Sequence, residues 1–155
     1  IRAGAGTGSV GEIWIASSPD LVHWGRYRHF LSPGYSASWN SKKIGPTPPI
    51  KTSKGWLEMI HGVNSPHDGA HYYIGAVLMD LDEPWRLIGK TYSFLLAADT
   101  QNERCGRVSN VVFPCGAVVD ETRDEIKLCY GAADTSIALA TGIVSDVIKS
   151  CLDQL

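Results

Sequence analysis

The chain has 155 residues and a mass of 16.8 kDa, with 44% hydrophobic and 19% charged residues, which is the composition of one globular domain. Fourteen basic and sixteen acidic residues give a net charge of −2 with no long run of either sign, which excludes bulk binding to nucleic acid or anionic membranes. No apolar stretch approaches the roughly 20 residues of a transmembrane helix. The opening residues lack the apolar core of a signal peptide. A cytoplasmic location is therefore expected.

Residues 1–12, IRAGAGTGSVGE, are rich in Gly and contain no initiator methionine. This composition predicts a linker or a truncated N-terminal segment. The folded domain is expected to occupy residues 13–155.

Short runs rich in β-branched and aromatic residues follow one another along the chain, separated by Gly, Pro, Asp or Asn. They predict strands at residues 12–17, 55–63, 71–79, 86–96, 110–119 and 125–133. Only residues 145–155, SDVIKSCLDQL, have apolar residues at helical spacing, with Ser145 as the candidate N-cap. The sequence therefore predicts an all-β fold with a short C-terminal helix.

A repeat underlies these strands. IWIASSPDLVHW, YYIGAVLMDLDEPWRLI and TSIALATGIVSDVI each have an apolar strand, then a turn containing Asp, then an apolar anchor. Equating Ile15, Ile74 and Ile137 gives spacings of 59 and 63 residues. Two hairpins precede the later units and end in His61-Gly62 and Tyr130-Gly131. This order favours two complete propeller blades and part of a preceding one, the alternative being a β-sandwich with coincidentally similar hairpins.

Propellers need about four to eight blades to close a ring without raw edges, and this chain is too short to supply them. The ring must then be completed either by a missing N-terminal half or by a second copy in a homodimer.

A lysine and a histidine stand near the two ends of KKIGPTPPIKTSKGWLEMIHG, residues 42–62. Strand alternation places Leu57, Met59 and His61 on one face of WLEMIHG. At the end of an inner strand, His61 is well placed to point at a ligand in the central channel. The alternatives are a structural histidine bonded to a carbonyl group and, for Lys43, an ordinary solvated lysine.

Two further residues are candidates for a ligand site. Phe113 is either an aromatic wall against a sugar face or part of the core. Asp134 lies among small residues between two apolar strands, so it either binds a ligand or bonds nearby amides in a turn. The four cysteines form no CxxC pair and have no histidine at zinc-ligand spacing, so buried free thiols and no metal site are expected.

Four motifs, taken in order, resemble the C-terminal half of glycoside hydrolase family 130. They are KKIGPTPPIKTSKGWLEMIHG, YYIGAVLMDLDEPWRLIG, NVVFPCGAVVDE and YGAADTSIALATG. That family comprises β-mannoside phosphorylases and β-mannosidases on a five-bladed β-propeller. The resemblance implies a partial five-bladed β-propeller of about two and a half blades.

The resemblance also implies roles for single residues. Lys43, His61 and Tyr72 match positions that hold the attacking phosphate, and Phe113 and Asp134 match positions that line the mannosyl pocket. Inorganic phosphate is the implied co-substrate, with no other cofactor, and a β-mannoside or related oligosaccharide is the implied substrate.

The family's general acid and phosphate-binding arginines lie in N-terminal blades outside this sequence, so no catalytic residue is assigned here. The expectation is the C-terminal half of a phosphorylase, incomplete or inactive by itself. The alternative is a non-catalytic carbohydrate-binding or assembly module.

Overall fold

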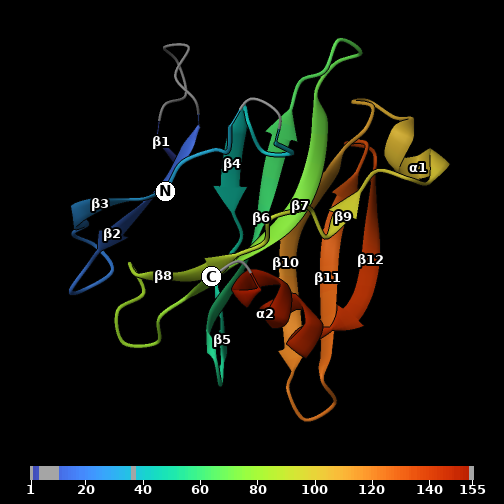
Figure 1. Ribbon diagram of the computed structural model, residues 1–155. Helices are drawn as coiled ribbons and strands as arrows, with labels where there is room; N and C mark the ends of the chain where they lie inside the picture. The colour runs from blue at the N-terminus through green and yellow to red at the C-terminus, as the bar shows by residue number, and fades with distance from the viewer. Residues whose placement is uncertain (1, 4–10, 36–37, 154–155) are drawn as a thin grey trace.

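The computed structural model describes residues 2–3, 11–35 and 38–153 and contains three antiparallel sheets that follow one another along the chain (Figure 1). The first sheet has the order β1-β2-β3, from Arg2–Ala3, Glu12–Ser17 and Gly25–Leu31. The central sheet has the path β4-β6-β7-β8, from Lys43–Pro46, Gly55–Asn64, His71–Met79 and Leu87–Lys90. In addition, β5 (Ile50–Thr52) pairs with β6, and β9 (Leu96–Ala97) pairs with β7. The last sheet has the order β10-β11-β12, from Val112–Asp120, Glu125–Ala132 and Ser136–Ile143.

Strand β6 lies at the centre of the molecule and buries both of its faces. Because side chains alternate along a strand, Leu57 and Met59 pack into one apolar core, which is shared with the last sheet and helix α2 (Val144–Leu152). Ile60 points the other way, into a second core that contains Ile13 and Leu31 of the first sheet. The face assignment made from the sequence of this strand is confirmed.

Helix α2 closes the last sheet against the edge of the central one. A Cβ atom at Gly89 on β8 would lie 2.2 Å from the backbone oxygen of Cys151, so only glycine lets the helix approach this closely. The N-terminus of the helix is capped from the β10–β11 turn, where Asp124 accepts hydrogen bonds from the backbone N–H of Ser145 at 2.8 Å and from its hydroxyl at 2.5 Å. Ser145 is thus inside the helix, and the N-cap is Ile143.

Other elements differ from the sequence prediction. The single strand expected over residues 86–96 is two strands, β8 and β9, separated by an irregular segment in which the Thr91 hydroxyl accepts a hydrogen bond from the Ala76 N–H. Strand β3, GRYRHFL, was missed because most of its side chains are polar and exposed. A four-residue helix, α1 (Gln101–Arg104), precedes β10. Residues 1 and 4–10 of the expected linker lie outside the described part of the chain.

The cysteine expectation holds for one residue. Cys151 is buried, whereas Cys105, Cys115 and Cys129 are exposed free thiols. In the described ranges, no group of three or more His, Cys, Asp or Glu residues is placed to hold a metal ion. No helix in the described ranges is long and apolar enough to cross a membrane.

Candidate functional site

His61 is held in the middle of the central sheet. Its strand neighbours are Gly45 on β4 and Ile74 on β7, directly opposite on either side. The side chain is only 5% exposed. A Cβ atom at Gly45 would lie 2.3 Å from Cε1 of the imidazole, so the ring occupies the space that the glycine leaves open. The sheet therefore fixes the position of this imidazole from both sides.

Three rings from two sheets surround this point. The centroid of His61 lies 4.6 Å from that of Phe113 on β10 and 6.1 Å from that of Tyr72 on β7. The Tyr72 and Phe113 centroids are 6.4 Å apart. Phe113 is 39% exposed, so it is a partly open wall and not part of the core. The cluster brings the central and last sheets together at one place.

Lys43 joins the same cluster. Its register partner on β6 is Val63, which in turn pairs with Tyr72 on β7, and residues directly opposite in antiparallel strands point to the same side. The ammonium group of Lys43 lies 4.9 Å from the centroid of the Tyr72 ring, within the range of a cation–π contact. Four of the five residues predicted from the sequence, Lys43, His61, Tyr72 and Phe113, are thus neighbours in space.

Asp134 is the predicted residue that no described contact joins to this cluster. It is exposed in the β11–β12 turn, with a left-handed φ of 51°. The turn lies at the same end of the last sheet as Phe113, because Gly131 pairs with Phe113 just before the turn begins. The strand pairing thus places Asp134 at the end of the sheet where the cluster lies, but no described contact links the two.

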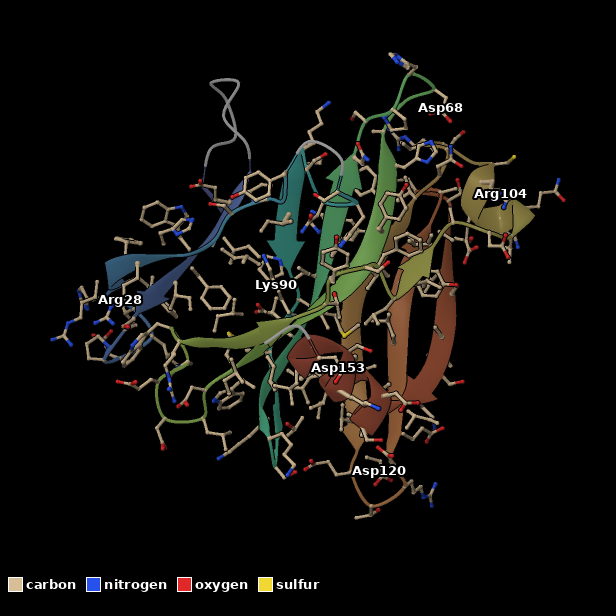
Figure 2. The ribbon with its side chains drawn as sticks, in the orientation of Figure 1. Arg28, Asp68, Lys90, Arg104, Asp120 and Asp153 are labelled. Carbon is tan, nitrogen blue, oxygen red and sulfur yellow. The ribbon has the colours of Figure 1, made fainter. Side chains whose placement is uncertain are left out.

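A polar cavity of about 420 Å³ lies beside Tyr72 and was not found from the sequence. In it, Nε2 of His71 lies 3.0 Å from a carboxylate oxygen of Asp68 and 3.3 Å from the amide nitrogen of Asn110. Arg104 on α1 also lines it, and Figure 2 shows Arg104 and Asp68 at the same end of the molecule. His71 begins β7, Arg104 ends α1, and Asp68 and Asn110 lie in loops, so no single periodic pattern in the sequence marks the group.

The arrangement defines a β-propeller protein with a cluster of cationic and aromatic side chains where two blades meet. The chain matches the family model described as β-1,4-mannooligosaccharide phosphorylase over residues 6–153. It therefore belongs to glycoside hydrolase family 130, and its all-β fold is a partial five-bladed β-propeller with a short C-terminal helix, as expected.

Two curated relatives that the chain matches are named as phosphorylases. The chain is 41% identical over 139 residues to the β-1,4-mannooligosaccharide phosphorylase of Ruminococcus albus, which covers 89% of this chain and 41% of that protein. It is 37% identical over 140 residues to the β-1,2-mannobiose phosphorylase of Listeria innocua, covering 88% of this chain and 37% of that protein. The chain thus spans about two fifths of the length of these relatives.

Solved structures agree with this. The Listeria innocua β-1,2-mannobiose phosphorylase in complex with β-1,2-mannobiose superimposes with a TM-score of 0.88 at 33% identity, covering 99% of this chain and 42% of that one. A structure from a study of family members that are glycoside hydrolases targeting β-1,2 mannosidic linkages in Candida mannan superimposes with a TM-score of 0.73 at 27% identity, covering 86% of this chain and 41% of that one. The family fold therefore carries both phosphorolysis and hydrolysis.

Proposed function

We propose that this chain forms one side of the active site of a β-mannoside phosphorylase. The observation that carries the proposal is the cluster in which Lys43 and His61 approach the rings of Tyr72 and Phe113 from four strands of two blades. In this role Lys43, His61 and Tyr72 hold the attacking phosphate. Phe113 forms a wall of the mannosyl pocket, and Asp134 binds sugar hydroxyls.

In the proposed reaction a phosphate oxygen attacks the anomeric carbon of the mannosyl group with inversion. The bond to the glycosidic oxygen breaks, that oxygen takes up a proton, and mannose 1-phosphate leaves. Phosphate must be neutralised and held in line with the leaving group, which a fixed ammonium and a fixed imidazole can do. A water nucleophile needs no such cradle, so the cluster favours phosphorolysis over hydrolysis.

The cluster itself contains no carboxylate, so the proton donor comes from outside it. Since the chain spans about two fifths of its relatives, we assign the donor and the remaining phosphate ligands to the blades that complete the ring. The last sheet offers a surface for those blades, because Val118, Ile137 and Leu139 are exposed by 71%, 79% and 64%. We propose that an N-terminal half of the same protein covers this surface and completes the ring. The alternative is that a second copy of this chain does so.

Three exposed free thiols also fit a reducing compartment, and a cytoplasmic location is part of the proposal.

The experiment compares the chain alone with the full-length product of its gene, each incubated with β-mannobiose and phosphate. We expect mannose 1-phosphate from the full-length protein, and Lys43→Ala is expected to lower kcat/KM for phosphate about tenfold or more, as the loss of a charged ligand contact requires. Lys42→Ala is the matched control, because Lys42 is exposed and its ammonium donates to the hydroxyl of Ser65 at 3.1 Å.

Two results would contradict the proposal. One is equal phosphate dependence in the Lys43→Ala and Lys42→Ala variants, and the other is free mannose as the product with or without phosphate. Light scattering on the isolated chain decides between the occupants: a mass near 16.8 kDa excludes the homodimer.

A further inference from the structure

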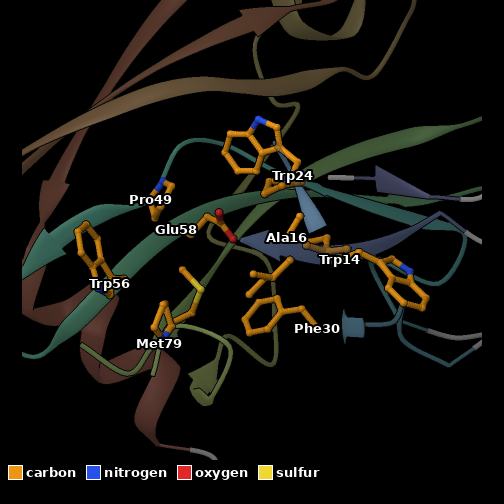
Figure 3. A pocket seen from close by; sticks show the side chains of 12 residues that line it. Trp14, Ala16, Trp24, Phe30, Pro49, Trp56, Glu58 and Met79 are labelled. Atoms are coloured by element: carbon orange, nitrogen blue, oxygen red, sulfur yellow. The ribbon is translucent and has the colours of Figure 1, made fainter. Parts of the chain in front are cut away.

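A second cavity lies between the first and central sheets and is separate from the cluster around His61. Its volume is about 380 Å³, which is within the range of small-molecule sites. Figure 3 shows a carboxylate directed into a space between aromatic side chains. The cavity is lined by Ile13, Trp14, Ile15, Ala16, Trp24, Phe30, Pro46, Pro49, Trp56, Glu58, Met79 and Pro84.

The carboxylate belongs to Glu58 on β6. Its side chain points to the face opposite Met59 and is 7% exposed. Within the described residues, no hydrogen bond or ion pair to this carboxylate is found. Burial raises the pKa of Glu58 to about 7. An ionised carboxylate that is largely removed from water and has no counter-charge costs stability, so a cation in this cavity would stabilise the ionised form of Glu58.

The walls provide ring faces but no side-chain donors. The indole N–H of Trp24 already donates to the backbone oxygen of Leu21, and that of Trp56 donates to the oxygen of Leu81, each at 3.2 Å. The indole N–H of Trp14 lies 3.3 Å from a carboxylate oxygen of Glu12. The three prolines of the lining have no backbone N–H. Among the described lining side chains, the carboxylate of Glu58 is therefore the polar group left for a ligand. It accepts hydrogen bonds and carries a negative charge when ionised.

We propose that this cavity binds a small organic ammonium ion, whose charged nitrogen meets Glu58 and whose apolar body lies against the rings of Trp24, Trp56 and Phe30. Cations are attracted to aromatic faces, most strongly to tryptophan, and the ammonium supplies the charge that the buried carboxylate lacks. A sugar fits poorly, because its several hydroxyls would lose their water partners and find one acceptor in return. The proposal does not depend on the phosphorylase assignment.

Other charged or titratable side chains near the cavity contact its lining residues without lining it themselves. His29 packs edge-on against the ring of Trp14 at 5.5 Å between centroids, and the ammonium of Lys51 lies 5.8 Å from the Trp56 centroid. The carboxylate of Glu12 accepts the hydrogen bond from the indole N–H of Trp14. Since Glu58 is the titratable residue of the lining itself, ammonium binding should follow its ionisation. Binding then tightens about tenfold between pH 6 and pH 8, and it releases a proton below pH 7.

The test uses n-butylammonium chloride as the probe, titrated into the chain while tryptophan fluorescence is recorded, with calorimetry in two buffers of different ionisation enthalpy. We expect a saturable signal for n-butylammonium. The neutral analogue n-butanol should bind with an affinity at least about tenfold lower. Glu58→Gln keeps the shape of the side chain and should weaken butylammonium binding by about tenfold or more and abolish its pH dependence. Glu83→Gln, which changes an exposed carboxylate on the β7–β8 loop, is the matched control and should bind as wild type does.

Equal affinity of wild type and Glu58→Gln would overturn the proposal, as would equal binding of butanol and butylammonium. A saturable signal from β-mannobiose with none from butylammonium would also overturn it in favour of a sugar site. Trp56→Leu is a second, independent test, because it removes one ring and leaves the carboxylate in place. It should lower the affinity for butylammonium, while proton release on binding should remain detectable. A Trp56→Leu variant that folds and binds the cation as wild type does would contradict the role of the rings.

Discussion

At the scale of single residues, the loop before β10 is fixed by one buried carboxylate. Glu103 is 4% exposed and accepts hydrogen bonds from the N–H groups of Asp99 and Thr100 at 2.8 and 2.7 Å and from the hydroxyl of Tyr130 at 2.7 Å. Burial by itself would raise the pKa of Glu103, but these hydrogen bonds outweigh it and hold the pKa at about 2. The carboxylate thus ties helix α1, which carries Arg104, to the last sheet.

Tyr130→Phe should lower the free energy of unfolding by about 1–3 kcal/mol at pH 7, because it removes a hydrogen bond to a buried charge. A carboxyl group with a lowered pKa stabilises the fold above its unfolded pKa, 4.5 for Glu103, and this contribution is lost as the pH falls towards 2. The difference between variant and wild type should therefore shrink below pH 4.5. Urea unfolding at pH 7 and pH 3 measures it.

Tyr92→Phe is the control for that comparison, because Tyr92 is 78% exposed. It should unfold as wild type does at both pH values. A difference for Tyr130→Phe that is equally large at both pH values would show that the carboxylate is not involved.

At the scale of elements, the pairing of β4 with β6 decides where the imidazole of His61 can lie. Gly45→Ala places a methyl group where the ring now stands, so the ring must move or the strands must separate. We expect a loss of about 1–3 kcal/mol in the free energy of unfolding and a raised KM for phosphate in the full-length protein. Thermal unfolding and the mannose 1-phosphate assay measure the two effects.

Gly25→Ala on β3 is matched to this change, because a Cβ atom there has no described atom within 4 Å. It should leave both quantities near those of wild type. Full activity of Gly45→Ala together with normal stability would mean that the imidazole position is not set by this glycine.

How far the sequence predicted these elements depends on the kind of signal each one has. The alternation of WLEMIHG determined the two faces of β6 because both faces are buried in apolar cores. The repeat also placed Ile15, Ile74 and Ile137 on strands, β2, β7 and β12. The alignment of the repeats is shifted by one residue, however. His61 pairs with Ile74, but the equivalent Tyr130 pairs with Ala138 and not with Ile137.

The site was predicted in part. The family motifs indicated Lys43, His61, Tyr72 and Phe113, and the structure brings these together. The neighbours His71 and Asn110 were not predicted, because their contact joins the start of β7 to the segment before β10, 39 positions further along the chain. The cavity around Glu58 also left no sequence signal, since its walls come from separate strands and turns of two sheets.

At the scale of the whole molecule, the two ends of the sheet series differ from its middle. The central sheet is covered on both faces, whereas the outer face of the last sheet exposes Ile137 and Leu139 side by side with Cys129 and Gly131 across the β11–β12 ladder. Exposed apolar surface of this kind marks an interface or an aggregation hazard. The proposed partner blades would cover it.

Ile137→Thr combined with Leu139→Thr should weaken association with the rest of the ring by about tenfold or more and raise the solubility of the isolated chain. Threonine is β-branched and therefore suits a strand at both positions, so the isolated chain should remain folded. Leu81→Thr on the β7–β8 loop is the control. Co-purification with the remaining blades and light scattering measure the association. Unchanged association of the double variant would show that this face is not the interface with those blades.

Strand β6 is hydrogen-bonded along one edge to β4 and β5 and along the other to β7, and apolar cores cover both of its faces. Its amide hydrogens should then be among the last in the molecule to exchange with deuterated water, because opening them requires disruption of both cores. Glu58 and His61 project from this slowest part of the backbone to opposite sides. Occupancy of either site should therefore be visible in the exchange of the loops and outer strands, while the exchange of β6 reports global unfolding.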